Sequence, residues 1–255
     1  MWTLDSQSPI PAWQHNDAGA GIRMGFSTRR GGVSAPPFDS LNLGRSTADR
    51  PEAVAENRAR YLGRLGADPG HLVTVGQVHG TGVAIASAPG FHPERDAVVS
   101  RVPGLVLAVS AADCLPILLV AHGSTGPGVA AIHAGWRGAA DRITDAALQV
   151  LLEHVGATPE AVSAHLGPCI RACCYQVGPE VADRFPAQDV ESRDGALFLD
   201  FPAAVRRQLV ESGVAAGSIE DTGACTSCEA HWYFSHRRDL GVTGRHWGVI
   251  GLGPV

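Results

Sequence analysis

The sequence contains no lysine, and all 20 of its basic residues are arginine. Schiff-base chemistry and lysine nucleophiles are therefore excluded, because both need a primary amine side chain. The net charge is also small, at −5 near neutral pH. Without an excess of positive charge the chain has no electrostatic reason to bind a polyanion, so we expect neither nucleic acid nor an acidic membrane surface as a partner.

Long apolar runs are lacking as well. The first 21 residues contain no basic segment followed by an apolar one, and no uninterrupted apolar run in the sequence is long enough to cross a bilayer. We therefore expect a cytoplasmic protein with no membrane partner. Cysteine is scarce, with six residues in 255. That number is too small for a disulfide scaffold and favours thiols, metal ligands or packing residues in a reducing compartment.

The chain shows no internal repeat, low-complexity tract or linker-like change in composition. Its apolar fraction of 45% and charged fraction of 18% are those of an ordinary globular protein. We therefore predict one domain over residues 1–255, in which residues 1–20 form an N-terminal extension.

Turn residues and apolar periodicity predict an α+β fold. Helices are expected over residues 49–66, capped by Asp49 and ended by Gly66, over 139–156, ended by Gly156, and over 178–185 and 201–213. Strands are expected at residues 71–78, 83–87, 96–100, 104–110, 116–121, 128–134, 162–167 and 246–252. Because the central strands follow one another without crossover helices, a doubly wound parallel sheet is disfavoured. We predict a mixed β-sheet core covered by helices on both sides, in an α/β/β/α-like order.

Three of the apolar strand segments lead to residues that bind soft or borderline metals, namely His79, Cys114 and His133. Neighbouring strand ends would bring these side chains together. Two imidazoles and one thiolate leave a fourth tetrahedral position open, which is the layout of a catalytic zinc site. However, the residues lack the short CxxC or HExxH spacing of a specific metal motif, and a single buried His or Cys is more often a packing residue. The residues alone leave both interpretations open.

Two glycine-rich turns carry arginines suited to an anion. In "HAGWRG", Arg137 stands where free N–H groups and a helix dipole favour phosphate. In "GFSTRRGGVS", Ser27 and Arg29 form a polar turn suited to phosphate or ribose. A solvated surface charge beside a packed glycine is the alternative in each turn. Trp136 is similarly open: it stacks on a purine or, as is more frequent for tryptophan, packs beneath the turn.

The other five cysteines lie in two short stretches. "CTSC" supplies Cys225 and Cys228 at metal-like spacing, and "PCIRACC" supplies Cys169, Cys173 and Cys174. A structural zinc site could be assembled from them, although no sequence rule brings the two stretches together. We favour packing residues or free thiols.

Several motifs together resemble a known bacterial family. They are "GFSTRRGGVS", "SLNLG", "QVHG", "ADCLPILL", "HAGWRG", "GPCI", "CCYQVG", "YFSHRRD" and "TGRHWGVIGL", in this order, from about Gly21 to the C-terminus. The family was once called multicopper polyphenol oxidoreductases or laccase-domain proteins, and is now described as purine nucleoside phosphorylases with adenosine deaminase activity.

The resemblance implies a single domain that holds zinc, with copper as a substitute ion, on His79, Cys114 and His133. The implied partners are small molecules, nucleosides and phosphate, and the implied reactions are phosphorolysis of adenosine, inosine and S-methyl-5′-thioadenosine and hydrolytic deamination of adenosine. Members have also been linked to editing of peptidoglycan precursors. We expect a monomer or a small homo-oligomer.

For such an enzyme, zinc-activated water would attack the purine C6 in deamination. In phosphorolysis, we predict that Arg29 and Arg137 hold the phosphate under the ribose C1′. Gln77 and Asn42 are the expected polar positioning groups for the substrate, and Asp113 is expected to orient a metal ligand.

Two other activities compete with this interpretation. A cysteine hydrolase would use Cys114 as nucleophile with His133 or His79 as base, and metal content and alkylation would separate it from a zinc enzyme. A copper polyphenol oxidase is disfavoured because none of the eleven histidines forms a His-x-His pair. A non-catalytic nucleotide sensor would bind nucleosides without turnover.

Overall fold

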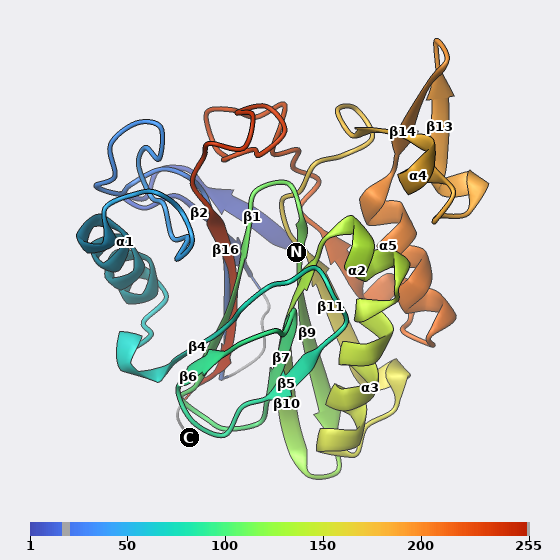
Figure 1. Cartoon of the computed structure of the whole chain (residues 1–255). Helices are drawn as coiled ribbons and strands as arrows, with labels where there is room; N and C mark the ends of the chain where they lie inside the picture. The colour runs from blue at the N-terminus through green and yellow to red at the C-terminus, as the bar shows by residue number, and fades with distance from the viewer. Residues whose placement is uncertain (17–20, 254–255) are drawn as a thin grey trace.

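Two mixed β-sheets stack face to face in the computed structural model, which describes residues 1–16 and 21–253 (Figure 1). The first sheet has seven strands in the order β1-β2-β3-β16-β8-β4-β6. Their bounds are β1 Trp2–Asp5, β2 Ala12–His15, β3 Ile22–Ser27, β16 His246–Leu252, β8 Val106–Ala111, β4 Leu72–Val75 and β6 Gly90–His92. β4 runs parallel to both of its neighbours, and the other pairs are antiparallel.

The second sheet has six strands in the order β15-β11-β9-β10-β7-β5. Their bounds are β15 Ile219–Asp221, β11 Val162–Leu166, β9 Leu115–Gly123, β10 Gly126–Ala134, β7 Ala97–Ser100 and β5 Val83–Ile85. The two outer pairs are parallel and the central strands are antiparallel. A small third sheet, β12-β14-β13, projects at one corner (Figure 1) and comprises β12 Gln176–Val177, β14 Ala196–Leu199 and β13 Val190–Arg193.

Helices cover the outer faces of the two large sheets (Figure 1). α1 (Pro51–Arg64) packs on the seven-stranded sheet, while α3 (Ile143–Val155) and α5 (Phe201–Glu211) pack on the six-stranded sheet. The shorter helices are α2 (Trp136–Ala140) and α4 (Pro179–Ala182), and four 3₁₀ turns span Pro69–His71, Pro159–Ala161, Ala187–Asp189 and Ala216–Ser218. None of the described helices is long and apolar enough to span a membrane.

Strand β8 shows how the layers share their residues. Val106 and Ala108 pack with the α1 cluster, whereas Leu107 and Val109 belong to the cluster between the two sheets. Since successive side chains point to opposite faces and both faces are buried, the whole strand is apolar. The same holds for β9 and β10, whose alternate residues pack between the sheets or against α3. The predicted α+β class and α/β/β/α order are therefore confirmed.

Local details differ from the predictions at two helices. The predicted helix over residues 139–156 is interrupted at Arg142, whose left-handed backbone (φ 66°) separates α2 from α3. Asp49 does not cap α1: the N-cap position is Arg50, and the Asp49 carboxylate instead accepts hydrogen bonds from Ser34 Oγ (2.6 Å) and Asn42 Nδ2 (2.9 Å). The glycine end of α3 at Gly156 is confirmed, with φ 65°.

The predicted N-terminal extension, residues 1–20, contains regular structure in its described part. β1 and β2 pair with each other, and β2 pairs with β3, so that residues 1–16 complete one edge of the seven-stranded sheet. Residues 17–20 lie outside the described part of the chain.

Candidate active site

The three predicted metal ligands come together where the two sheets end on one side of the molecule. His79 lies in the loop after β4, Cys114 lies between β8 and β9, and His133 is the penultimate residue of β10. The Cys114 Sγ is 3.8 Å from His79 Nε2, and one ligand atom from each of the three residues lies within 4.8 Å of the other two. The geometry thus brings together side chains that are far apart in sequence.

A buried carboxylate, Asp96, joins two of these residues. Its Oδ1 accepts from the His79 backbone N–H (2.9 Å) and lies 2.9 Å from His133 Nδ1. Its Oδ2 accepts from the N–H groups of Val78 (3.1 Å) and Gly80 (2.9 Å). Because the His133 Nδ1–H is committed to Asp96, Nε2 is left as the free ligand atom. Asp96 was not predicted as a site residue, although a charged residue that opens an apolar strand was the available signal.

Left-handed backbone conformations concentrate at this site. Gln77, His79 and Asp113 have φ angles of 56°, 62° and 89°, a region that non-glycine residues seldom occupy. Such conformations persist only where surrounding contacts fix them, and they cluster at functional sites. For the loop that carries His79, the two oxygens of the Asp96 carboxylate supply those contacts.

Asp113, which was expected to orient a metal ligand, directly precedes Cys114 in the chain. Its carboxylate accepts from Thr226 Oγ1 (2.6 Å), Ser235 Oγ (3.0 Å) and the backbone N–H of Arg237 (2.6 Å). These three bonds anchor the segment before Cys114 to the loop over residues 225–239. None of these three bonds reaches Cys114 or the imidazoles, so the role of Asp113 in orienting a metal ligand stays a prediction.

The electrostatics favour a thiolate at this site. Burial raises the pKa of the Cys114 thiol, but the charge and hydrogen bonds of His133 and His79 outweigh it and bring that pKa to about 6. Burial lowers the pKa of His133, but the Cys114 thiolate and Asp96 more than compensate and raise it to about 9. Burial likewise acts to raise the pKa of Asp96, yet its hydrogen bonds, from His133 first, hold that pKa below the usual value.

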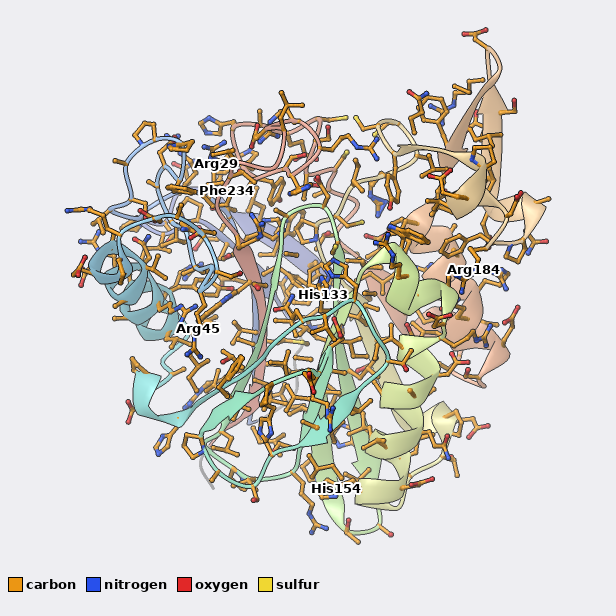
Figure 2. The ribbon with its side chains drawn as sticks, viewed as in Figure 1. Arg29, Arg45, His133, His154, Arg184 and Phe234 are labelled. Carbon is orange, nitrogen blue, oxygen red and sulfur yellow. The ribbon has the colours of Figure 1, made fainter. Side chains whose placement is uncertain are left out.

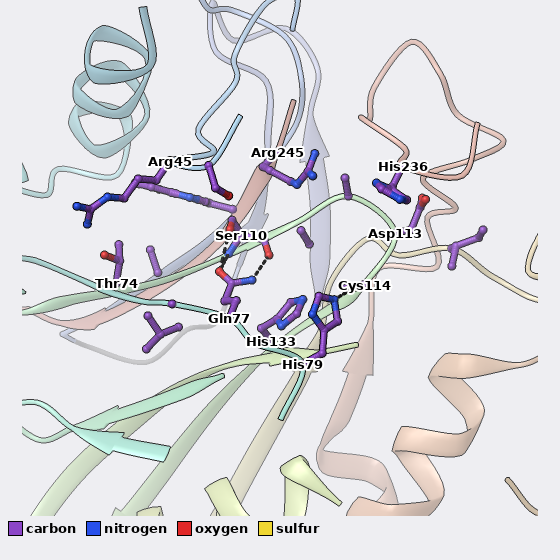
Figure 3. A pocket seen from close by; sticks show the side chains of 18 of the residues that line it. Arg45, Thr74, Gln77, His79, Ser110, Asp113, Cys114, His133, His236 and Arg245 are labelled. Atoms are coloured by element: carbon purple, nitrogen blue, oxygen red, sulfur yellow. Dashed lines mark hydrogen bonds between the residues drawn. The ribbon is translucent and has the colours of Figure 1, made fainter. Parts of the chain in front are cut away.

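A cavity of about 770 Å³ opens above the triad (Figure 3). It is lined by residues of β4, β8, α1 and β16, by the loops that carry His79 and Cys114, and by the start of α2. Its aromatic side chains are Phe91, Trp136, Tyr175, Phe201 and Trp247. Such a volume is in the range of ligand pockets, and the flat aromatic groups suit a planar base.

The cavity is strongly cationic although the chain as a whole is acidic. Five arginines line it: Arg45, Arg58, Arg137, Arg237 and Arg245. Within residues 1–16 and 21–253, none of the five forms a salt bridge with a carboxylate, whereas nine other arginines do. Burial, and then the nearby charge of Arg45, lowers the pKa of Arg58. Guanidinium groups without carboxylate partners around one cavity favour an anionic ligand.

Three residues predicted to bind substrate lie away from this cavity. Ser27 is buried, and its Oγ accepts from the Trp247 backbone N–H (2.8 Å). Arg29 donates to the Asp39 carbonyl (2.8 Å) and carboxylate (3.1 Å) and stacks on Phe234, at the position labelled in Figure 2. These polar groups are satisfied inside the protein, which corrects the interpretation of the "GFSTRRGGVS" turn as a phosphate or ribose site.

Asn42 is also buried and does not line the cavity, and its role is indirect. Its Oδ1 accepts from the N–H groups of Arg245 (2.9 Å) and Gly44 (3.0 Å), so the amide positions one of the cavity arginines. Asn42 is therefore corrected from a substrate contact to a support for Arg245.

Gln77, Trp136 and Arg137 do line the cavity. Gln77 bridges to β8: its amide donates to the Ser110 carbonyl (2.6 Å), and its Oε1 accepts from the Ser110 N–H and Oγ, both at 2.8 Å (Figure 3). Trp136 packs against the α3 and α5 cluster with one side and borders the cavity with another. Arg137 stacks on its ring at 4.3 Å. α2 has only five residues, so the charge of Arg137 is the main attraction for an anion.

The donor set of the triad fits zinc. Two imidazoles and one thiolate are ligands that zinc prefers, and the hydrogen bond from His133 to Asp96 is the support that metal-binding histidines commonly have. Three protein ligands leave room for a substrate or solvent ligand, as at catalytic zinc sites.

Comparisons with known proteins identify the family. The sequence pattern of the family described as "Multi-copper polyphenol oxidoreductase laccase" matches residues 23–253. A purine nucleoside phosphorylase of Deinococcus radiodurans is 44% identical over 231 residues, covering 89% of this chain and 88% of the relative. The purine nucleoside phosphorylase YfiH of Escherichia coli is 38% identical over 250 residues, covering 95% and 98% of the two chains.

Solved structures agree with the sequence matches. The hypothetical protein YfiH of Bacillus licheniformis has a TM-score of 0.91 at 30% identity, covering 98% of each chain. YlmD of Geobacillus stearothermophilus has a TM-score of 0.87 at 33% identity, covering 99% of this chain and 96% of that one. The fold, the placement of the site and the extent of the sequence matches lead to one conclusion: the chain belongs to the multi-copper polyphenol oxidoreductase laccase family.

Proposed function

We propose that this protein is a purine nucleoside phosphorylase that also deaminates adenosine, with zinc on His79, Cys114 and His133. The observation that carries the proposal is the combination, in one cavity, of the triad with five arginines that lack carboxylate partners. Phosphorolysis needs an anion and a nucleoside in contact, and this cavity offers a cationic wall and aromatic surfaces for both. The names of the relatives support the phosphorylase part of this proposal.

The arginines would bind and orient phosphate. Figure 3 shows Arg45 and Arg245 on the side of the cavity opposite His79 and His133. In phosphorolysis an oxygen of hydrogen phosphate bonds to the ribose C1′ while the bond from C1′ to the purine nitrogen breaks. The departing base takes the electron pair of that bond and the proton that the hydrogen phosphate gives up. Guanidinium groups fixed in advance would hold the phosphate in line with that bond and screen its charge.

The aromatic side chains and the triad would act on the base. Phe91, Trp136 and Trp247 line the cavity, and each carries an arginine guanidinium over its ring. A purine would pack against the parts of these rings that the arginines leave uncovered. When bound, the zinc ion would supply Lewis acidity and activate water at neutral pH, as deamination at the purine C6 requires. Asp96 would keep the His133 Nδ1 protonated and the His79 loop in place. Adenosine, inosine and S-methyl-5′-thioadenosine are the proposed substrates.

The first experiment combines metal analysis with a product assay. Protein expressed without added copper is analysed for metal and incubated with adenosine with and without phosphate. We expect zinc on the triad, adenine only when phosphate is present, and inosine in both reactions. The variant Cys114→Ala should lose the triad zinc and both products. A chain that contains no zinc, or that releases no base from any of the three nucleosides in phosphate, would refute the proposal.

A matched pair of arginine variants tests the phosphate site. Arg45→Gln should raise the KM for phosphate about 10- to 100-fold. This increase corresponds to the loss of about 1.5–3 kcal/mol, which is what hydrogen bonds to a charged group contribute. Deamination without phosphate should keep its rate. The control is Arg184→Gln, which removes an exposed arginine, labelled in Figure 2, that pairs with Asp141 and does not line the cavity. Equal losses of phosphorolysis and deamination in Arg45→Gln would contradict the assignment.

One observation favours the cysteine hydrolase as a second candidate. The contact between Cys114 Sγ and His79 Nε2, together with the lowered pKa of Cys114, is also what a nucleophilic thiolate needs. The metal analysis separates the two functions, because a zinc-bound thiolate resists alkylation. A metal-free protein in which Cys114 is alkylated rapidly would establish the hydrolase instead.

A further inference from the structure

A second group of sulfur atoms lies outside the cavity. Cys173 and Cys174 come from the loop between β11 and β12, and Cys225 and Cys228 come from the loop after β15. Cys173 Sγ is 3.4 Å from the sulfurs of both Cys225 and Cys228, and Cys174 Sγ is 3.1 Å from that of Cys228. All four sulfurs lie within 4.8 Å of one another, and all four thiols are free.

Both loops present their sulfurs from fixed turns. In the first loop, the N–H groups of Cys174 and Tyr175 donate to the Arg171 carbonyl, both at 2.8 Å. In the second loop, the Cys225 N–H donates to Glu229 Oε1 (2.9 Å), and the Glu229 N–H donates to the Cys225 carbonyl (3.0 Å). Hydrogen bonds within each loop therefore hold the backbone that carries the sulfurs.

The two loops are also joined at their bases. Cys169 and Cys225 form an isolated parallel β-bridge, and the Thr226 N–H donates to the Cys169 carbonyl (3.0 Å). This bridge explains how stretches more than 50 residues apart place their cysteines together, which no sequence rule could predict.

From this geometry we propose that Cys173, Cys174, Cys225 and Cys228 bind a structural zinc ion, separate from the ion of the triad. Four thiolates about 2.3 Å from a tetrahedral zinc have sulfur atoms about 3.8 Å apart, only slightly farther apart than the contacts seen here. Four protein ligands close the coordination sphere, as at structural rather than catalytic zinc sites. The open triad and the closed four-cysteine site would thus hold the same metal for different purposes.

Exposure agrees with this assignment. Cys173 and Cys228 are exposed, so an ion can enter from solvent. The second loop is also held in place by Arg238, whose guanidinium donates to the carbonyls of Thr226 (2.8 Å) and Ser227 (3.3 Å).

The ion would fix one wall of the cavity. Tyr175, which lines the cavity, directly follows Cys174. Thr226 directly follows Cys225 and donates to the Asp113 carboxylate, which adjoins Cys114. Linking the two loops through a metal would therefore order the residues on either side of the nucleoside.

The test is a zinc count in a background that lacks the triad thiolate. We expect two zinc ions per chain in the wild type, one in Cys114→Ala, and none in Cys114→Ala combined with Cys228→Ser. The control combines Cys114→Ala with Cys169→Ala. Cys169 is buried beside the second loop, but its sulfur is not in the four-cysteine group, so that double variant should keep its zinc. Because the Cys114→Ala background needs no enzymatic activity, the result is independent of the proposed function.

Alkylation of the Cys114→Ala protein provides a readout with all four ligands intact. With zinc bound, the four cysteines should resist alkylation. After chelation they should react, and backbone hydrogen exchange over residues 171–175 and 225–229 should become faster. A Cys114→Ala protein that retains no zinc after reconstitution, or whose four cysteines react equally with and without chelator or form disulfides in the purified chain, would overturn the proposal.

Discussion

The substitution Asp96→Asn should show how much the zinc affinity of the triad depends on the residue that supports the ligands, because it leaves the three ligands themselves unchanged. Asp96 accepts four hydrogen bonds, with heavy-atom distances of 2.9–3.1 Å. One ring N–H and one backbone N–H donate to Oδ1, and two backbone N–H groups donate to Oδ2. Asparagine has the same shape but only one acceptor oxygen. Whichever way its amide is turned, an NH₂ group faces two donors.

The structure sets the magnitude. Two hydrogen bonds to a buried carboxylate are lost, and at about 1.5–3 kcal/mol each the total is about 3–6 kcal/mol. This free energy is divided between unfolding and zinc binding. If the NH₂ replaces Oδ1, it faces His133 Nδ1, which favours the tautomer protonated at Nε2 and removes that ligand atom. We therefore expect zinc affinity to fall about 10- to 100-fold, as for other residues that support metal ligands.

The assay is competition for zinc with a chromophoric chelator, alongside urea unfolding of the apoprotein. Asp189→Asn is the matched control, since Asp189 is also buried and paired, with Arg207, but belongs neither to the triad nor to the cavity lining. It should destabilise the fold without changing triad affinity. Unchanged zinc affinity in Asp96→Asn, in a folded protein, would refute the reasoning.

Three further predictions concern packing, acid stability and the corrected arginine. Gly135→Ala should lower zinc affinity about tenfold or more in the same competition assay, because a Cβ there would lie 2.4 Å from the His79 ring and displace the ligand. Unchanged affinity would show that the His79 ring moves aside without losing its place as a ligand. Burial lowers the pKa of His165 to about 4 and of His246 to about 3, so the unfolded state takes up protons first as the pH falls below 6.5. Stability should therefore decline from pH 6.5 downward, by about 3 kcal/mol for His165 alone once the pH is below 4, and urea titrations of His165→Gln should show a smaller decline. Arg29→Met should destabilise the fold by about 1–3 kcal/mol through its lost internal hydrogen bonds but leave the phosphate KM unchanged, and a large rise in that KM would restore Arg29 as a phosphate ligand.

The large strands could be predicted because their surroundings are uniform. β8, β9 and β10 are buried on both faces, which leaves continuous apolar runs in the sequence. β1, β2 and β6 have four residues or fewer and lie at or beside sheet edges, so they leave no comparable pattern. The break between α2 and α3 depends on one backbone angle at Arg142, which no periodicity encodes.

The site could be predicted only in part, for a related reason. Residue chemistry identifies His79, Cys114 and His133 as candidate metal ligands whatever their neighbours are. A polar turn, by contrast, does not show whether its groups face a ligand or one another. Ser27, Arg29 and Asn42 have internal partners and do not line the cavity. Arg45 and Arg58, which were not predicted from the sequence, do line it.

The position of β16 has a consequence for how the protein is made. This strand lies between β3 and β8 in the middle of the seven-stranded sheet, yet it follows every other strand of that sheet in the chain. During synthesis, the β1-β2-β3 and β8-β4-β6 halves of the sheet cannot join until residues 246–252 have left the ribosome. Until then, the edges of β3 and β8 that pair with β16 lack their partner strand. The nascent protein therefore exposes two sheet edges that can pair with the wrong strands. A chaperone would have its largest effect before β16 is added.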